Sequence, residues 1–208
     1  MTVRLHRGDL PNLDAYKGAV AIDTETLGLD VNRDRLCVVQ LSPGDGSADV
    51  VQIVPGQMSA PNIQKLLTDP SILKIFHFGR FDIGVMYKAF GVMAQPVYCT
   101  KIASRLVRTY TDRHGLKDLA RELLGVDLSK QQQSSDWGAK DLSEAQVAYA
   151  ASDVLYLHAL RDKLDAMLAR EGRTALAAAC FGFLPERVKL DLAGWADEDI
   201  FSHSVKAG

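Results

Sequence analysis

A short apolar run that ends in two acidic residues constrains this chain more than any other feature. Residues 19–22 are Ala-Val-Ala-Ile, and Asp23, Thr24 and Glu25 follow them. Such a run indicates a buried strand, and the two-residue period of a strand directs Asp23 and Glu25 to the same side. Neighbouring carboxylates repel each other, and the loss of solvent increases the repulsion. Either a divalent cation lies between them, or they are two solvated acids at the end of a strand.

Acidic residues at two later positions raise the same question. Asp82 follows an expected strand over residues 73–77 and lies at the start of an expected helix. Tyr149 and Asp153 are four residues apart in an expected long helix, so they lie one turn apart on the same face. Taken singly, each position has a plain explanation, because helix N-termini favour acids and amphipathic helices often carry tyrosine. Together with the pair on the first strand, they make four carboxylates and one phenol.

This set of side chains is typical of an enzyme that hydrolyses phosphodiesters with two metal ions. Carboxylate oxygens are the ligands that Mg²⁺ and Mn²⁺ prefer. Two such ions, about 3.5–4 Å apart, can hold the attacking and the leaving oxygen in line. We therefore expect two divalent ions, Mg²⁺ or Mn²⁺, among the four carboxylates.

The order of strands and helices predicts one mixed α/β domain. Three strands with short connections suit an antiparallel meander, two more strands alternate with helices, and helices follow. The expected strands cover residues 19–23, 36–41, 49–53, 73–77 and 97–99, and the expected helices cover 60–67, 80–89, 101–107, 116–124, 143–170 and 174–181. This order predicts a five-stranded mixed sheet flanked by helices in a single domain, residues 1–208, with its core over about 19–171.

The C-terminal tail, residues 184–208, lies beyond this core and carries several large apolar side chains. They are Leu190, Leu192, Trp195, Ile200 and Phe201. Left together in water, side chains of that size would form a large apolar patch. We therefore expect the tail to pack either on its own core or on a neighbouring subunit.

Composition excludes several other kinds of protein. The 208 residues include 24 basic and 26 acidic side chains, and 47% are hydrophobic, which is ordinary for a folded domain and excludes a disordered chain. A net charge of −2 argues against a protein that holds long nucleic acid by bulk charge. Three widely spaced cysteines and the lack of a long apolar run predict a soluble, cytoplasmic protein with free thiols and no membrane contact.

Several segments resemble motifs of the DEDD superfamily of 3′-5′ exonucleases, and of the catalytic domain of ribonuclease D in particular. They follow one another in the order that these motifs have in that family. They are Asp23–Thr26, Leu36–Leu41, His77–Asp82, Lys101–Leu106, Ser135–Trp137 and Leu142–Leu157. The tyrosine one turn before the last aspartate is typical of one subgroup. Two further segments, 109–116 and 130–137, resemble the small stand-alone nano-RNase C family.

The resemblance implies a ribonuclease-H-like fold and a metal-dependent enzyme that cleaves short RNA, down to dinucleotides, into mononucleotides. The implied catalytic residues are Asp23, Glu25, Asp82, Tyr149 and Asp153, of which the four acids would hold the metal ions. Tyr149 would orient the attacking water. The resemblance also implies a homo-oligomer, described for the family as an octamer.

Five further residues are candidates for substrate contacts, namely Thr26, Leu29, His77, Phe81 and Trp137. The backbone near Thr26, together with Glu25, would bind the terminal 3′ hydroxyl, and Leu29 matches a residue that separates two bases in related nucleases. Three of them also have a structural explanation, with Leu29 as a loop residue, Phe81 as a core residue and Trp137 as a loop anchor. The basic side chains between residues 105 and 117 either contact a 5′ phosphate or form a solvated face.

Two other functions stay open at this point. The same carboxylates would serve a general 3′-5′ exonuclease that acts on longer RNA, or on DNA in processing or repair. A catalytically silent nucleic-acid-binding module is disfavoured, because all five catalytic positions hold competent residues. Only about 25 residues follow the last expected helix, so we expect no accessory domain for long RNA, which favours short substrates.

Overall fold

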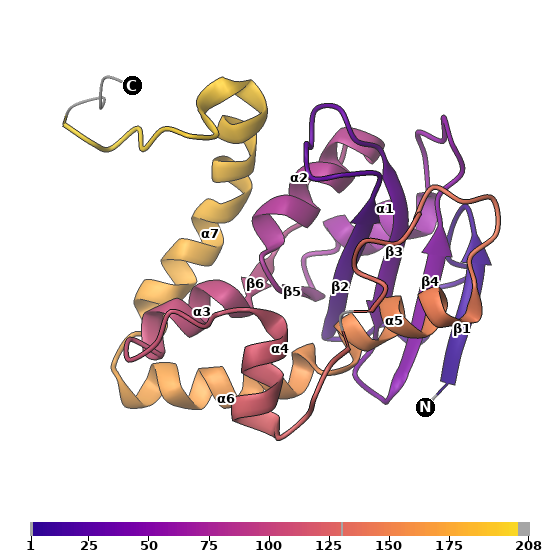
Figure 1. Cartoon of the computed structure of the whole chain (residues 1–208). Coiled ribbons are helices and arrows are strands. Elements are labelled where there is room, and N and C mark those ends of the chain that lie inside the picture. The colour runs from indigo at the N-terminus through magenta and orange to yellow at the C-terminus, as the bar shows by residue number, and fades with distance from the viewer. Residues whose placement is uncertain (1, 130, 204–208) are drawn as a thin grey trace.

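The centre of the protein is a mixed β-sheet, seen in a computed structural model that describes residues 2–129 and 131–203 (Figure 1). Within these residues the sheet has six strands in the order β1-β4-β3-β2-β5-β6. Their bounds are β1 (Thr2–Arg7), β2 (Ala19–Thr26), β3 (Leu36–Ser42), β4 (Ser47–Gln52), β5 (Leu73–Phe76) and β6 (Val97–Cys99). β2, β3 and β4 form an antiparallel meander, whereas β1, β5 and β6 join by parallel pairing. The mixed α/β class with a ribonuclease-H-like sheet is confirmed.

Helices cover both faces of the sheet, so its central strand is buried throughout. All seven residues of β3 are buried. The helical segments are α1 (Pro61–Thr68), α2 (Gly79–Phe90), α3 (Thr100–Val107), α4 (Leu116–Leu119), the π-helical turn η1 (Ala120–Leu124), α5 (Glu144–Leu155), α6 (Leu157–Arg170), α7 (Thr174–Leu190) and the π-helical turn η2 (Asp191–Trp195). α5 lies across the front of β2, β3 and β4, while α1 and α2 lie behind the sheet (Figure 1). β2 is thus approached by α5 on one face of the sheet and by α2 on the other.

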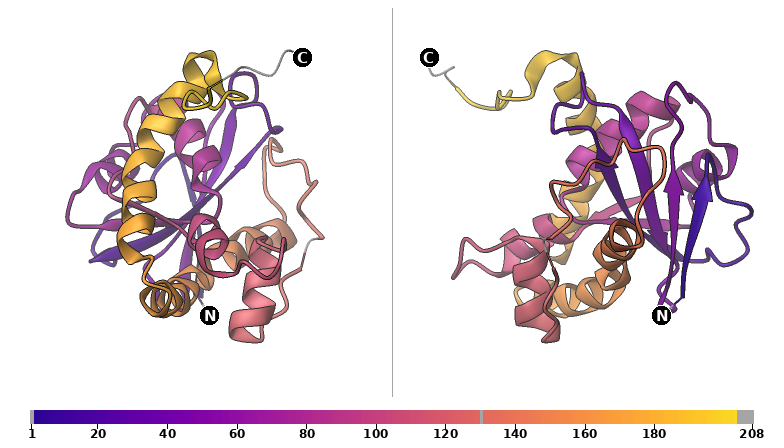
Figure 2. Two further views of the ribbon diagram at one scale, coloured as in Figure 1. Left: turned by 90° about the vertical axis from the view of Figure 1, so that its left-hand side faces the viewer. Right: turned by 45° about the vertical axis from the view of Figure 1, so that its right-hand side comes forward.

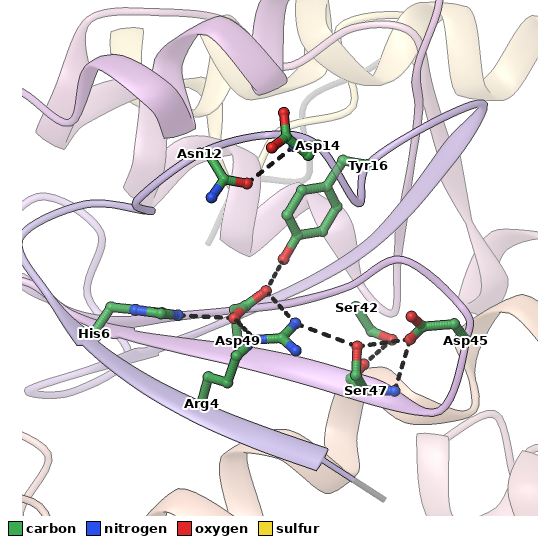
Figure 3. Close-up of polar contacts among 9 residues, drawn as sticks. All are labelled: Arg4, His6, Asn12, Asp14, Tyr16, Ser42, Asp45, Ser47 and Asp49. Atoms are coloured by element: carbon green, nitrogen blue, oxygen red, sulfur yellow. Dashed lines mark hydrogen bonds and ion pairs between the residues drawn. The ribbon is translucent and has the colours of Figure 1, made fainter.

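The sixth strand, β1, corrects the five-strand prediction. Arg4 and His6 on β1 both contact Asp49 on β4, at 2.7 Å from Arg4 Nε and 2.8 Å from His6 Nε2 (Figure 3). Tyr16 also donates a hydrogen bond to the same carboxylate, at 2.6 Å. β1 is therefore held largely by polar contacts, and Leu5 on it is half exposed. The alternation of Val3 and Leu5 with polar residues in this strand is short, and the five-strand prediction does not include it.

The Asp49 carboxylate gives a testable contribution to stability. Burial disfavours its ionised form, but the hydrogen bonds from Arg4, Tyr16 and His6 outweigh burial and lower the pKa of Asp49 to about 2. An unfolded aspartate has a pKa of about 3.9, so this contribution is complete above that value and is lost as the pH falls from about 4 to 2. We expect Asp49→Asn to lower the free energy of unfolding by about 2 kcal/mol at pH 7, and by less at pH 3.

Urea denaturation at both pH values measures this difference. Asp162→Asn, which changes an exposed acid on α6, is the matched control. An equal loss of stability at pH 7 and pH 3 would show that Asp49 acts by shape rather than by charge.

Two helices differ in extent from their prediction. The segment 143–170 is two helices, α5 and α6, separated at Tyr156, and a capping box begins α5, with Ser143 accepting a hydrogen bond from the backbone amide of Gln146. The predicted helix 174–181 instead continues to Leu190 as α7 and passes through Pro185. Leu184 and Val188 are buried, and this packing overrides the helix-breaking tendency of proline.

The predicted tail therefore begins inside a helix and then leaves the core. Figure 2 shows α7 running along one end of the molecule and η2 at its tip, from which the chain leads away. Arg80 on α2 binds Asp191 at this tip, with 2.7 Å between Nη2 and Oδ1. Trp195 at the end of η2 and, beyond it, Ile200 and Phe201 are exposed, Phe201 by 76%. Residues 204–208 lie outside the described part of the chain. Among the described residues, no helix is both long and apolar enough to cross a bilayer.

Candidate active site

Three of the predicted acids meet at the end of β2. Asp23 and Glu25 lie on β2, and Asp153 approaches them from α5. Carboxylate oxygens of the three lie within 4.8 Å of one another, and all three residues are partly buried. The strand period places Asp23 and Glu25 on one face of β2, and in the folded protein α5 crosses that face.

Asp82 reaches the same site from the other layer. It lies in the first turn of α2, directly after β5, and is buried. Thr24, between the two acids of β2, points to the opposite side of the strand and donates a hydrogen bond from Oγ1 to Asp82 Oδ1 at 2.6 Å. Asp82 lies outside the group of three but lines the same cavity. Asp23, Thr24 and Glu25 on β2 therefore face both helical layers. The two acids face α5, and the threonine faces α2.

The four acids are poised for a cation. Burial, the larger cause, and then repulsion by Asp153 and Asp82 raise the pKa of Glu25 to about 8. Burial likewise raises the pKa values of Asp82 and Asp153 to about 7, against opposing hydrogen bonds from Thr24 and Tyr149. The pKa of Asp23 rises well above its usual range for the same two reasons, burial and repulsion by its three acidic neighbours. A hard divalent ion would relieve this repulsion, and an all-oxygen donor set suits one.

Gln40 is a partner of Asp23 that the sequence analysis did not identify. It lies directly opposite Asp23 in the pairing of β3 with β2, and its Nε2 is 3.3 Å from Asp23 Oδ2. Gln40 is fully buried, and its Oε1 has no hydrogen-bond partner among the described residues. The signal was available in the sequence, since a single amide in the otherwise apolar run of 36–41 is costly to bury without a purpose. The amide holds the Asp23 carboxylate in place.

Tyr149 and Trp137 form a pair at one side of the acids. Tyr149 lines the cavity, and burial together with the charge of Asp153 raises the pKa of its phenol. The Trp137 ring packs 6.0 Å from the Tyr149 ring, and Trp137 is buried outside the cavity lining. This placement favours a packing role for Trp137, which supports Tyr149 from behind.

The acids lie in an open cavity of about 370 Å³. Of the residues suggested for substrate contacts, Thr26, Leu29, His77 and Phe81 line it. Leu29 is 88% exposed, so it is not a core residue. The His77 Nδ1 lies 2.9 Å from Thr100 Oγ1, and burial, helped by the nearby Lys101 charge, lowers the pKa of His77 to about 3. His77 is therefore neutral.

Two cationic residues and one aromatic residue complete the wall of the cavity. Lys117, from the basic segment noted in the sequence, lines it, whereas Arg108 of that segment is fully buried and paired with Glu122. Phe78 and Lys101 also line it and were not singled out from the sequence, although both lie in segments that resemble ribonuclease D. No composition or spacing rule distinguishes them from their neighbours.

Comparison with known proteins agrees with this geometry. A sequence model described as a 3′-5′ exonuclease matches residues 9–169. The solved structure of Brucella melitensis NrnC with bound Mg²⁺ is 66% identical and superposes with a TM-score of 0.95, over 98% of this chain and 100% of that one. The same nuclease bound to pGG is 67% identical, over the same shares of the two chains, with a TM-score of 0.96.

Ribonuclease D of Granulibacter bethesdensis is a more distant relative. It is 37% identical over 156 residues, which are 75% of this chain and 39% of that protein. The chain thus spans about two fifths of the length of the ribonuclease D relatives that it matches. The family match over most of the chain and the likeness to NrnC over its full length lead to one conclusion: the chain belongs to the DEDD 3′-5′ exonucleases, an enzyme family that normally uses divalent metal, and within it to the group that includes NrnC.

Proposed function

We propose that the protein is a 3′-5′ exoribonuclease that degrades short RNA, especially dinucleotides, to nucleoside monophosphates. The observation that carries the proposal is the convergence of four carboxylates and one tyrosine in a cavity of about 370 Å³. A cavity of this size suits a substrate of one or two nucleotides. The likeness to a nuclease solved with pGG supports the choice of a short substrate.

The carboxylates would hold two divalent ions, Mg²⁺ or Mn²⁺. Asp23, Glu25 and Asp153 would share one side of this site, and Asp82 would complete it from α2. When bound, the ions would supply the positive charge that offsets the scissile phosphate and makes water more acidic. The protein contributes the fixed positions of the carboxylates, which Gln40 and Thr24 hold through their hydrogen bonds.

Tyr149 would orient the attacking water rather than remove its proton. With its pKa raised by burial and by Asp153, the phenol stays protonated at neutral pH. The phenol donates its one proton to Asp153, so its Oη can accept a hydrogen bond from the water and fix the direction from which the water approaches the phosphorus. Trp137 holds the Tyr149 ring in place from behind.

The end of β2 would recognise the free 3′ end. The Thr26 hydroxyl donates a hydrogen bond to the carbonyl of Gly28 and so shapes the turn that presents Leu29. The backbone of Thr26 and the Glu25 carboxylate would bind the terminal 3′ hydroxyl. Leu29 and Phe81 would separate and contact the bases beside them, and neutral His77 would line their pocket.

A length series tests this proposal against a general exonuclease for longer RNA or DNA. We expect kcat/KM for an RNA dinucleotide to exceed that for a 20-mer by at least about tenfold, because binding comes from the cavity rather than from a phosphate track. The measurement uses 5′-labelled RNAs of two to twenty nucleotides, the matching DNAs, and Mg²⁺ or EDTA. Leu29→Ala should flatten the length profile. Efficiency that rises steadily with length would favour the general exonuclease.

We also infer that the chain forms a homo-oligomer, an octamer by its family resemblance. The support is the exposed apolar surface at the end of the chain, where Trp195, Ile200 and Phe201 stay in contact with solvent. Phe201 lies 5.9 Å from Phe183, ring to ring, so part of this surface is continuous with α7. A second copy that covers it would remove the patch from water.

Light scattering tests the assembly. We expect the full chain to have a mass that is a multiple of 22.7 kDa, and the double variant Ile200→Asp, Phe201→Asp to be smaller, because two carboxylates cannot be buried in an apolar contact. Met58→Asp, which changes a side chain that is 79% exposed, is the control. A wild-type mass of one chain would refute the assembly, and an unchanged mass in the double variant would remove the tail from the interface.

We propose a cytoplasmic location for this activity. Cys37, Cys99 and Cys180 are all free thiols, and the first two are buried. Free cysteines are typical of a reducing compartment, and short RNA fragments arise in the same compartment as RNA turnover.

A further inference from the structure

One residue beside the catalytic cavity has a backbone conformation that its side chain disfavours. Phe78 connects β5 to α2 with φ 63° and ψ 41°, in the left-handed region. Among the described residues it is the only one other than glycine with a positive φ. A bulky side chain in this region is a genuine outlier, and Gly79 stands directly beside it in the sequence. The fold therefore keeps a phenylalanine where glycine or asparagine would fit without strain.

Core packing does not account for this phenylalanine. Its side chain is 46% exposed, whereas the neighbouring Phe76 on β5 is fully buried. One face of the ring is covered by Lys101 from α3, whose Nζ lies 4.4 Å from the ring centroid. The exposed part of the ring is then mainly its other face and its edges. Strained backbone that carries an exposed side chain is typical of functional sites.

The position of Phe78 indicates what the exposed ring would meet. Phe78 lines the catalytic cavity and also an adjacent cavity of about 600 Å³ between α2 and the end of α7. Leu29 and Phe81 line both cavities as well, so the three apolar side chains form the boundary between them. Asp82, four residues after Phe78, supplies a carboxylate to the catalytic cavity.

We propose that Phe78 is a stacking platform for one nucleobase of the substrate, with Lys101 behind the ring. This inference rests on the proposed function and adds a specificity residue to it. A flat aromatic face is the surface on which every base can stack, and a cation behind the ring would lie close enough to the site to attract a phosphate. The left-handed backbone at the start of α2 directs the ring to the boundary of the cavity, and a platform fixed there would bind the base without first being ordered.

Substitutions at Phe78 separate stacking from structure. For an RNA dinucleotide, Phe78→Leu and Phe78→Gly should raise KM by about 5- to 150-fold, the usual range for one lost stacking contact, with kcat within about threefold of wild type. Phe78→Tyr, which keeps the aromatic face, should retain the wild-type KM. Phe78→Gly should have a Tm no lower than that of Phe78→Leu, because glycine adopts the left-handed conformation freely. Met58→Ala, outside the catalytic cavity, is the control.

Substrates that lack a base give the decisive comparison. The assay measures KM and kcat of wild type and of Phe78→Leu for dinucleotides that carry an abasic ribose at either the 5′ or the 3′ position. If Phe78 stacks on a base, the KM penalty of Phe78→Leu disappears for one abasic substrate and persists for the other. A penalty that persists for both, or no penalty on the intact dinucleotide, overturns the proposal.

Failure of the proposed function gives a different result. If the wild type cleaves only longer RNA or DNA, the dinucleotide function is wrong, and the same abasic comparison is made at the last two positions of the shortest strand that it cleaves. The stacking proposal is then supported if the KM penalty of Phe78→Leu disappears at one abasic position of that strand, and it is overturned if the penalty persists at both. If no nucleic acid is cleaved in Mg²⁺ or Mn²⁺, both proposals fall together.

Discussion

Replacing Asp153 with asparagine is expected to reduce cleavage at least about a thousandfold while leaving the fold intact. The change removes one charge from the group of three acids at the end of β2, and electrostatic stabilisation by bound metal is worth several kcal/mol in such sites. Because burial, and then the charge of Asp82, raises the pKa of Asp153 to about 7, the charge of Asp153 destabilises the metal-free protein at pH 8. Asp153→Asn should therefore have a Tm in EDTA at pH 8 that equals or exceeds that of wild type.

Asp49→Asn is the matched comparison, because it also neutralises a buried aspartate. It should lose stability and keep its activity, the reverse of Asp153→Asn, since Asp49 is bound by Arg4, His6 and Tyr16 and lies outside the catalytic cavity. Undiminished cleavage by Asp153→Asn, or by wild type in excess EDTA, would show that the carboxylates do not carry the reaction.

Tyr149→Phe is expected to lower kcat by about 10²–10⁴, the range for a residue that acts in proton transfer or orients its partner. The phenol is removed from the cavity while the ring stays packed against Trp137, so the fold should not change. The four carboxylates are untouched, and the rise in Tm on adding Mg²⁺ should match that of wild type. Single-turnover cleavage of an RNA dinucleotide measures the rate, and thermal unfolding with and without Mg²⁺ measures metal binding.

Tyr87→Phe on α2 is the control for removal of a phenol, since Tyr87 lies outside the catalytic cavity. If Tyr149→Phe cleaves at the wild-type rate, the phenol only fills space beside Asp153. If its response to Mg²⁺ is lost as well, the effect on rate comes from a damaged metal site.

The arrangement of the acids could be predicted because short-range periodicity determines it. The period of a strand places Asp23 and Glu25 on one side, and a spacing of four in a helix places Tyr149 beside Asp153. That these two pairs meet is a tertiary fact, which is expected from the set of residue types and from the resemblance to ribonuclease D rather than from any local pattern. The catalytic roles of the individual residues stay predictions until the variants are measured.

Features that depend on polar or backbone detail could not be predicted. β1 joins the sheet through contacts of Arg4 and His6 with Asp49, which the short alternation of Val3 and Leu5 in its sequence does not indicate. The break between α5 and α6 at Tyr156 has no glycine or proline to mark it. The left-handed conformation of Phe78 is opposite to what its residue type favours, so no propensity could indicate it.

The three acids that meet at the end of β2 come from distant parts of the chain, and this has a consequence for biosynthesis. Asp23 and Glu25 leave the ribosome early, whereas Asp153 follows only after about three quarters of the chain has been made. Contacts of such large sequence separation form late in folding, after the closing of a long loop. A nascent chain therefore has no complete set of these acids until Asp153 has been made.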